Sequence, residues 1–404
     1  MICRSLKRVQ RVRSPVRAMP AAVLALSLLS GGCDRGPGEP RDPAGGGAVE
    51  GVGVPESAAT ERRFALIELG GRAGDDGARA DVIGLHISAD RLRSSLALIP
   101  EAQWPHVLIL CVDSLGGALR EVAPLADLIA QLQERGRVVV WVRQAWSAAA
   151  LVALAAEERY MTSDAVIGGA VTVVRSRDSD SAVTGEDLAT ALKVGEEVAR
   201  RGGVEPLVVR AMQTPTPLSV DVAADGRLSW RMDLLGARIV NPAGEVLALT
   251  SRDAAELGVS RGTADDLEEL LRLIDQTERG SDGQELGAVR WVRVGQAAAD
   301  DQRACRDRMA AALERVVVLL PHVEMAMQHA AAAPDAQERD RQIARVRALL
   351  EEARRLVQES PAIGLYTACT PDWLNARDAE LRAVASVRSP ADSGEGASPD
   401  AREK

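Results

Sequence analysis

Apolar and polar positions follow two alternating periods through the central part of the chain. FALIEL, VLILCVDS and RVVVWV are short apolar runs bounded by turn residues, which predicts buried strands. Between the last two runs, apolar residues recur at helical spacing from Leu119 to Leu132, and Gly136 ends the pattern. Strand, helix and strand at this spacing predict a right-handed crossover in a parallel sheet that is buried on both faces. We therefore expect residues 61–275 to form an α/β domain.

The pattern becomes that of long amphipathic helices at residues 297–387. Two helical stretches joined by AAAPDA predict an antiparallel hairpin. Their apolar stripes are Met309, Leu313, Val316, Val317 and Leu320 on the first helix and Ile343, Val346, Leu349, Leu350 and Leu356 on the second. Two interpretations stay open, a self-contained hairpin and an arm that docks a partner or assists oligomerisation. We expect residues 276–296 to be a linker and residues 388–404 a polar, disordered tail.

The N-terminal 33 residues have the pattern of an export signal. A strongly basic segment precedes AAVLALSLL, an apolar run too short to span a bilayer, and this order is typical of a secretory signal. SGGC, ending at Cys33, resembles a bacterial lipobox, although an ordinary signal with Cys33 nearby by accident remains an alternative. We expect an exported lipoprotein attached through Cys33 on the periplasmic side of the cell envelope. Residues 34–60 are rich in Gly and Pro, which predicts a flexible linker.

Charge and cysteine spacing exclude some classes of function. A net charge of −9 argues against a nucleic-acid partner, which requires a basic face. No cluster of Cys and His has metal-ligand spacing, so we expect neither a metal nor a cofactor. Cys305 and Cys369 both lie in the helical region, and in an exported protein they could form a disulfide.

Two predicted turns carry the candidate chemistry. In VDSLGGAL, Gly116 and Gly117 stand where a strand gives way to a helix, and their backbone N–H groups suit an oxyanion hole. In AWSAA, Ser147 stands at the next such turn, and adjacent parallel strands would bring both turns to one edge of the sheet. Small residues around Ser147 would equally allow close helix packing. Trp146 either lines a substrate cleft or covers the core.

The distribution of lysine singles out one residue. Lys and Arg total 49, yet the lysines are only Lys7, Lys193 and Lys404, of which Lys193 alone lies between the leader and the last residue. A site that needs a cation able to lose its proton cannot use arginine, whose pKa stays too high, and this is a reason to consider Lys193. Chance retention of one surface lysine explains the same observation.

The ordered motifs resemble those of a known family. VDSLGGAL, VVVWV, AWSAA, RYMTSDAVIGGAV and GEVLALTSRDAAELGVSRGTADDLEELLRLI resemble the ClpP-class membrane serine proteases, the NfeD-type and signal peptide peptidase A relatives. The resemblance covers about half of the chain and implies a ClpP/crotonase-like α/β core of repeated ββα units. It also implies that Ser147 is the nucleophile and that Gly116 and Gly117 form the oxyanion hole. We further expect Leu115 and Trp146 to border the substrate cleft.

The general base is where the chain departs from the family. A family lysine shielded from water takes the serine proton, and Lys193 is the candidate here. Lys193 lies about seven residues, or two helical turns, after the position that the family pattern predicts. Two functions therefore stay open. One is a serine endopeptidase that cleaves membrane-associated or unfolded polypeptides, and the other is a degenerate lipoprotein that binds an envelope protein. Members of the family often form dimers or rings, so we also expect that this chain can form a homo-oligomer with either function.

Overall fold

The computed structural model describes residues 60–71, 81–175, 180–282 and 289–386. The expected signal, Cys33, the linker up to residue 59 and the tail lie outside these residues. The sheet and the C-terminal helices belong to one compact unit, Ser57–Lys404. Within the described ranges, no helix is both long and apolar enough to cross a membrane.

A seven-stranded sheet forms the core of the central region. Its strand order is β11-β5-β3-β2-β1-β12, and β4 also pairs with β3. All strand pairs are parallel except β11 with β5. The strands are β1 (Thr60–Leu69), β2 (Val107–Ser114), β3 (Arg137–Trp146), β4 (Glu158–Met161), β5 (Val166–Gly168), β11 (Ala248–Thr250) and β12 (Val289–Arg293).

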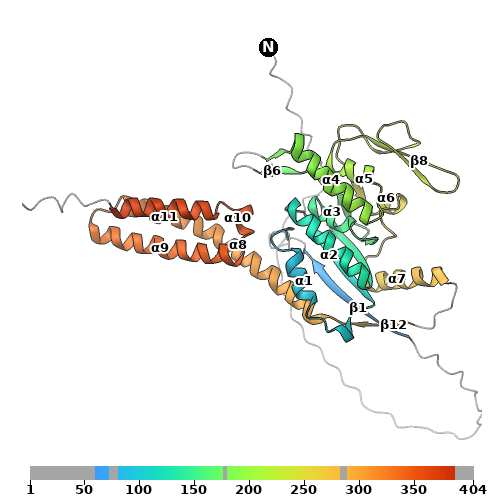
Figure 1. The fold of residues 1–404 in the computed structure, drawn as a ribbon, viewed down its shortest axis with the longest axis horizontal. Coiled ribbons are helices and arrows are strands. Elements are labelled where there is room, and N and C mark those ends of the chain that lie inside the picture. The colour runs from blue at the N-terminus through green and yellow to red at the C-terminus, as the bar shows by residue number, and fades with distance from the viewer. Residues whose placement is uncertain (1–59, 72–80, 176–179, 283–288, 387–404) are drawn as a thin grey trace, which may run out of the picture. The chain divides into compact units, whose positions relative to one another are not determined.

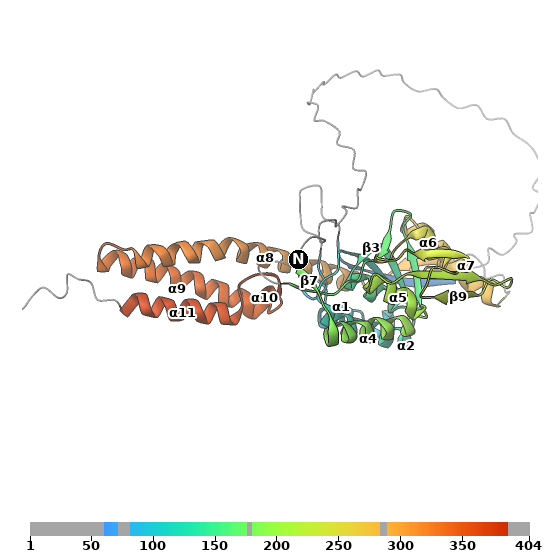
Figure 2. The same cartoon turned by 90° about the horizontal axis from the view of Figure 1, so that it is seen from above.

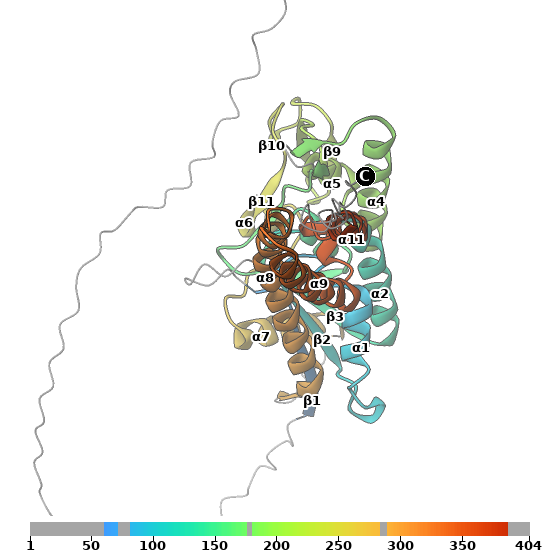
Figure 3. The same ribbon diagram turned by 90° about the vertical axis from the view of Figure 1, so that its left-hand side faces the viewer.

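Helices cover both faces of this sheet, as Figure 3 shows for α1, α2 and α4 on one side and α7 on the other. Successive side chains of β2 alternate between the two cores: Leu108 and Leu110 face α1–α5, whereas Ile109 and Cys111 face α7. The predicted α/β fold with a parallel core is confirmed. The helices are α1 (Ala89–Leu96), α2 (Val122–Arg135), α3 (Ala148–Leu154), α4 (Gly185–Arg201), α5 (Pro206–Gln213), α6 (Ser251–Glu256) and α7 (Leu267–Asp282).

Short elements complete the central region. A three-stranded antiparallel sheet has the order β10-β8-β9, and β6 pairs with β7; Figure 1 labels β8 and β6. Two 3-10 turns flank β2, at Glu101–Gln103 and Leu119–Glu121. The remaining strands are β6 (Val173–Arg175), β7 (Asp180–Ala182), β8 (Leu218–Val222), β9 (Leu228–Arg231) and β10 (Arg238–Asn241).

The C-terminal region contains the expected hairpin and a further long helix. The long helices α8 and α9 pack against each other, and α11 packs along α9 (Figures 1 and 2). Val317 was expected in the apolar stripe but is 44% exposed, because Val316 and Leu319 occupy the buried face instead. The elements are α8 (Gln296–Ala331), α9 (Ala336–Glu359), α10 (Ile363–Tyr366) and α11 (Pro371–Ser386).

The expectation of a linker at residues 276–296 is wrong for much of that segment. Helix α7 continues to Asp282, and β12 pairs in parallel with β1 at the edge of the main sheet. Trp291 of β12 packs edge-on against Phe64, with ring centroids 6.3 Å apart. The segment escaped prediction because VRWVR is short, basic and only half-buried, as an edge strand can be.

The expected pairing of Cys305 with Cys369 is also wrong. Both thiols are free and buried, and Arg91 Nη1 donates a hydrogen bond to Cys305 Sγ over 2.6 Å. Cys369 lies in the core of the helical region, where burial raises the pKa of its thiol. We expect mass mapping of the unreduced protein to return both residues as unmodified thiols. A peptide that links them would contradict this arrangement.

Candidate active site

Ser147 occupies a strained turn between a strand and a helix. Strand β3 ends at Trp146 and α3 begins at Ala148, while Ser147 has φ 53° and ψ −127°. Of the non-glycine residues in the described ranges, Ser147 alone has positive φ. Such a backbone costs roughly 1–3 kcal/mol and persists where the surroundings hold it. Here the Ser147 N–H donates to the Gly168 carbonyl over 3.0 Å. A turn of this kind lifts a serine hydroxyl out of the sheet.

Gly116 brings the end of β2 against this serine. A Cβ at Gly116 would lie 2.5 Å from Ser147 Cβ and 2.8 Å from the Trp146 carbonyl oxygen, and φ is 106°. Both constraints require glycine. The expected role of its N–H needs correction, because that group donates to Ser114 Oγ over 3.2 Å. Gly116 therefore shapes the turn, while its N–H already has an acceptor.

With the Gly116 N–H bonded to Ser114, the backbone N–H groups near Ser147 that could bind an oxyanion are those of Gly117 and Ala148. The bridge beside Gly117 consists of the Ile83 N–H bonded to the Gly116 carbonyl and the Ala118 N–H bonded to the Ile83 carbonyl, over 2.8 and 3.0 Å. The Gly117 N–H takes no part in this bridge. The Ala148 N–H, at the first position of α3, has no acceptor within its helix. Sequence reasoning missed Ala148, although its place directly after the serine is the signal that identifies it.

The structure does not form the expected pair of Ser147 and Lys193. Lys193 is exposed on α4, which packs inward through Ala191 and Gly195. Since Lys193 is two residues from each of these, it lies on roughly the opposite side of the helix. Among the residues that the structure describes, neither the Lys193 amine nor the Ser147 hydroxyl has a hydrogen-bond partner. Counting in sequence could not reveal this, because it fixes the helix position but not the buried face.

The two residues predicted to border the cleft differ in exposure. Leu115 is 62% exposed directly before Gly116, and so offers an apolar surface beside the serine turn. Trp146 is half-buried, and its indole N–H donates to Gln144 Oε1 over 3.1 Å. Its ring also limits Gly169, where a Cβ would lie 2.9 Å from Trp146 Cε3. Trp146 thus serves packing on one side and remains accessible on the other.

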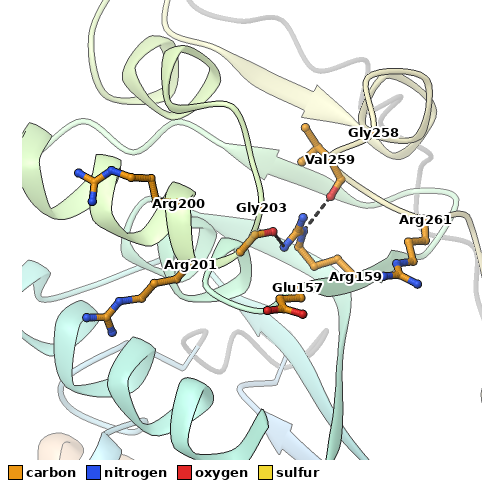
Figure 4. Close-up of a pocket in the computed structure, with 9 residues that line it drawn as sticks. Glu157, Arg159, Arg200, Arg201, Gly203, Gly258, Val259 and Arg261 are labelled. Atoms are coloured by element: carbon orange, nitrogen blue, oxygen red, sulfur yellow. Dashed lines mark hydrogen bonds between the residues drawn. The ribbon is translucent and has the colours of Figure 1, made fainter. Parts of the chain in front are cut away.

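A separate pocket of about 400 Å³ gathers arginines but shares no residue with the serine turn. Arg159 is its buried member, and its guanidinium donates to carbonyls at the ends of three helices. Arg200 and Arg201 point away from Arg159 (Figure 4), and both pair with Glu197. Because the cations diverge and are already partnered, this arrangement serves packing at the helix ends. Burial, with a smaller effect of Arg261, lowers the pKa of Arg159 to about 10.

The strained serine turn and the glycine pair, on a parallel sheet, are the features through which this chain resembles the ClpP-class, NfeD-type proteins. Over 185 residues the chain is 28% identical to membrane protein NfeD1b of Bacillus subtilis. The match covers 46% of this chain and 37% of NfeD1b, so the chain spans little more than a third of that relative's length. The predicted resemblance to the ClpP-class, NfeD-type proteins is confirmed.

Solved structures with a similar arrangement include two mutants of the 1510-N membrane-bound stomatin-specific protease, one of them in complex with a substrate peptide. Each is 15% identical, with TM-scores of 0.39 and 0.40, and the alignments cover 59% and 61% of this chain and 98% and 99% of the protease chains. ClpP1 from Listeria monocytogenes is 14% identical with a TM-score of 0.31, covering 51% of this chain and 94% of its own. No protein-family model matches the chain.

Proposed function

We propose that the protein is a serine endopeptidase of the ClpP/NfeD type, acting on membrane-associated or unfolded polypeptides. The observation that carries the proposal is the strained backbone of Ser147 against Gly116. Ser147 Oγ attacks the substrate carbonyl carbon, and the N–H groups of Gly117 and Ala148 stabilise the resulting oxyanion. Loss of the amine leaves an acyl-enzyme, which water then hydrolyses. The side chains of Leu115 and Trp146 contact the substrate.

The base in this proposal is Lys193, and its exposure sets a condition. A lysine that takes a proton from serine must lie within hydrogen-bond reach, about 3 Å, and be shielded from water. Helix α4 would have to shift toward Ser147 when a substrate binds. The exposure of Lys193 also favours a second function, a catalytically degenerate ClpP-like lipoprotein that binds an envelope protein partner through the same surface.

Labelling with a fluorophosphonate probe distinguishes the two functions. We expect the wild-type chain to be labelled and to cleave casein, Ser147→Ala to do neither, and Lys193→Ala to lose both by about 10²-fold or more. Cleavage that survives Ser147→Ala would exclude this nucleophile. Cleavage that depends on Ser147 but not on Lys193 would require another base. A wild-type chain that is neither labelled nor active would favour the binding protein.

The proposed location is the cell envelope, with a lipid on Cys33. The basic and apolar leader and SGGC support this placement, and the similar NfeD1b is itself named a membrane protein. Cells supplied with a tagged fatty acid should incorporate it into the wild-type protein and not into Cys33→Ser. Label retained by the variant would disprove lipidation at Cys33 without excluding export.

A further inference from the structure

We propose that the C-terminal helical region positions the oxyanion side of the site, and that Tyr366 and Arg306 are the positioning residues. The inference rests on the proposed function, since it assigns a part in that reaction to helices that have no counterpart in the family motifs. Its physical basis is a segment, residues 81–87, that contacts the glycine pair on one side and the helical region on the other.

On the first side, residues 81–87 hold the end of β2. Ile83 forms the bridge with Gly117, and a Cβ at Gly117 would lie 2.2 Å from the Ile83 carbonyl oxygen. Ser114 Oγ donates to the Asp81 carbonyl over 2.7 Å and accepts from the Gly116 N–H. A displacement of this segment would therefore move the backbone of Gly116 and Gly117.

On the second side, the same segment is held by the helical region. Tyr366 Oη donates to the Ile83 carbonyl over 2.9 Å, the same oxygen that accepts the Ala118 N–H. Leu85 is 2% exposed and belongs to the core of the helical region, where it packs with residues of α8 and α9. One carbonyl thus joins Tyr366 to the bridge beside Gly117.

A buried charge network adds a second connection. Arg306 of α8 donates to Asp81 Oδ2 over 3.0 Å and to Glu68 Oε2 over 3.3 Å. The Arg306 side chain is 7% exposed and that of Asp81 17%, so the bond between them is largely shielded from water and geometrically defined. His86 extends the network: Nδ1 accepts the Val82 N–H over 3.0 Å, and burial lowers the pKa of the imidazole. His86 thus closes the segment on itself, and Arg306 fixes its Asp81 end from outside the sheet.

Oxyanion donors must be placed within about 0.5 Å, and an error of about 1 Å costs about 10²-fold in rate. Loss of the Tyr366 hydroxyl should let the Ile83 bridge relax and displace the Gly117 N–H. Because this donor acts on the developing charge more than on the bound substrate, kcat should fall while KM stays unchanged.

The test compares full-length Tyr366→Phe with Tyr160→Phe. Tyr160 is the matched control, since its hydroxyl contacts Thr277 and Glu158 in the core facing α7. We expect Tyr366→Phe to lower kcat for casein peptides about tenfold or more with unchanged KM, and Tyr160→Phe to leave kcat within about twofold. Hydrogen exchange of the Ile83 and Ala118 amides should accelerate about tenfold in Tyr366→Phe and stay unchanged in Tyr160→Phe. Unfolding temperatures identify any variant that fails to fold.

Arg306→Met should produce the same two effects, and Arg315→Met is its control because the Arg315 partner, Glu352, lies within the helical region itself. Unchanged exchange at Ile83 and Ala118 in both Tyr366→Phe and Arg306→Met would overturn the inference. Faster exchange with an unchanged kcat would overturn it too. If the wild-type chain proves inactive, the proposed function fails, while the exchange experiment still decides whether the helices hold the glycine pair.

Discussion

Gly116→Ala should abolish fluorophosphonate labelling of Ser147, with a loss of at least about 10²-fold. The new methyl group would lie 2.5 Å from Ser147 Cβ and 2.8 Å from the Trp146 carbonyl oxygen, separations that no real Cβ tolerates. Backbone cannot give way like the tip of a flexible side chain, so the serine turn or the end of β2 must move. The φ of 106° adds strain of its own.

A second glycine variant separates the steric clash of the new methyl group from the strain of a positive φ. Gly226 also has positive φ, 82°, but a Cβ there would meet no atom within 4 Å. Gly226→Ala therefore carries a backbone penalty of about 1 kcal/mol without touching the site, and it should be labelled at the wild-type rate. Labelling of Gly116→Ala at that same rate would contradict the packing of β2 against Ser147. Circular dichroism of both variants should match that of the wild-type chain, which tests that they are folded.

The sequence was sufficient for the main fold because its signals are local. The apolar runs of β1, β2 and β3 and the helical spacing before Gly136 specify their own elements, and chain chirality leaves one parallel arrangement. Strand β12 was missed for the opposite reason. Its five residues are stabilised by pairing with β1, where Thr60 pairs with Val289, 229 positions later in the chain, and pairing over such a distance leaves little local pattern.

The sequence predicts where Ser147 and the glycine pair lie, but not which groups contact them. Ser147 and the glycine pair follow strands, so periodicity places them at one sheet edge. The acceptor of the Gly116 N–H is the neighbouring Ser114 side chain, whose rotamer no sequence pattern specifies. The contacts of Arg306 and Tyr366 with residues 81–87 depend on where α8 and α10 dock, which is tertiary information.

Arg159→Met should lower the free energy of unfolding by about 3 kcal/mol, because methionine fills similar space but donates no hydrogen bond. Arg159 is 4% exposed, and its guanidinium donates to the carbonyls of Leu154, Ala156, Gly202 and Val259. These oxygens lie where α3, α4 and α6 end, at the negative ends of the helix dipoles. Buried acceptors left without a donor cost about 1 kcal/mol or more each.

Urea unfolding followed by circular dichroism measures this loss, with Arg227→Met as the control. Arg227 pairs with Asp225 at the surface, where its side chain is 86% exposed, so its removal should cost no more than about 0.5 kcal/mol. The stability loss of Arg159→Lys should lie between those of Arg159→Met and Arg227→Met, since one ammonium cannot reach carbonyls on three helices. An Arg159→Met variant as stable as wild type would show that water or neighbouring N–H groups satisfy these helix ends. In that case, hydrogen bonding to the ends of α3, α4 and α6 would not be the role of Arg159 in β4.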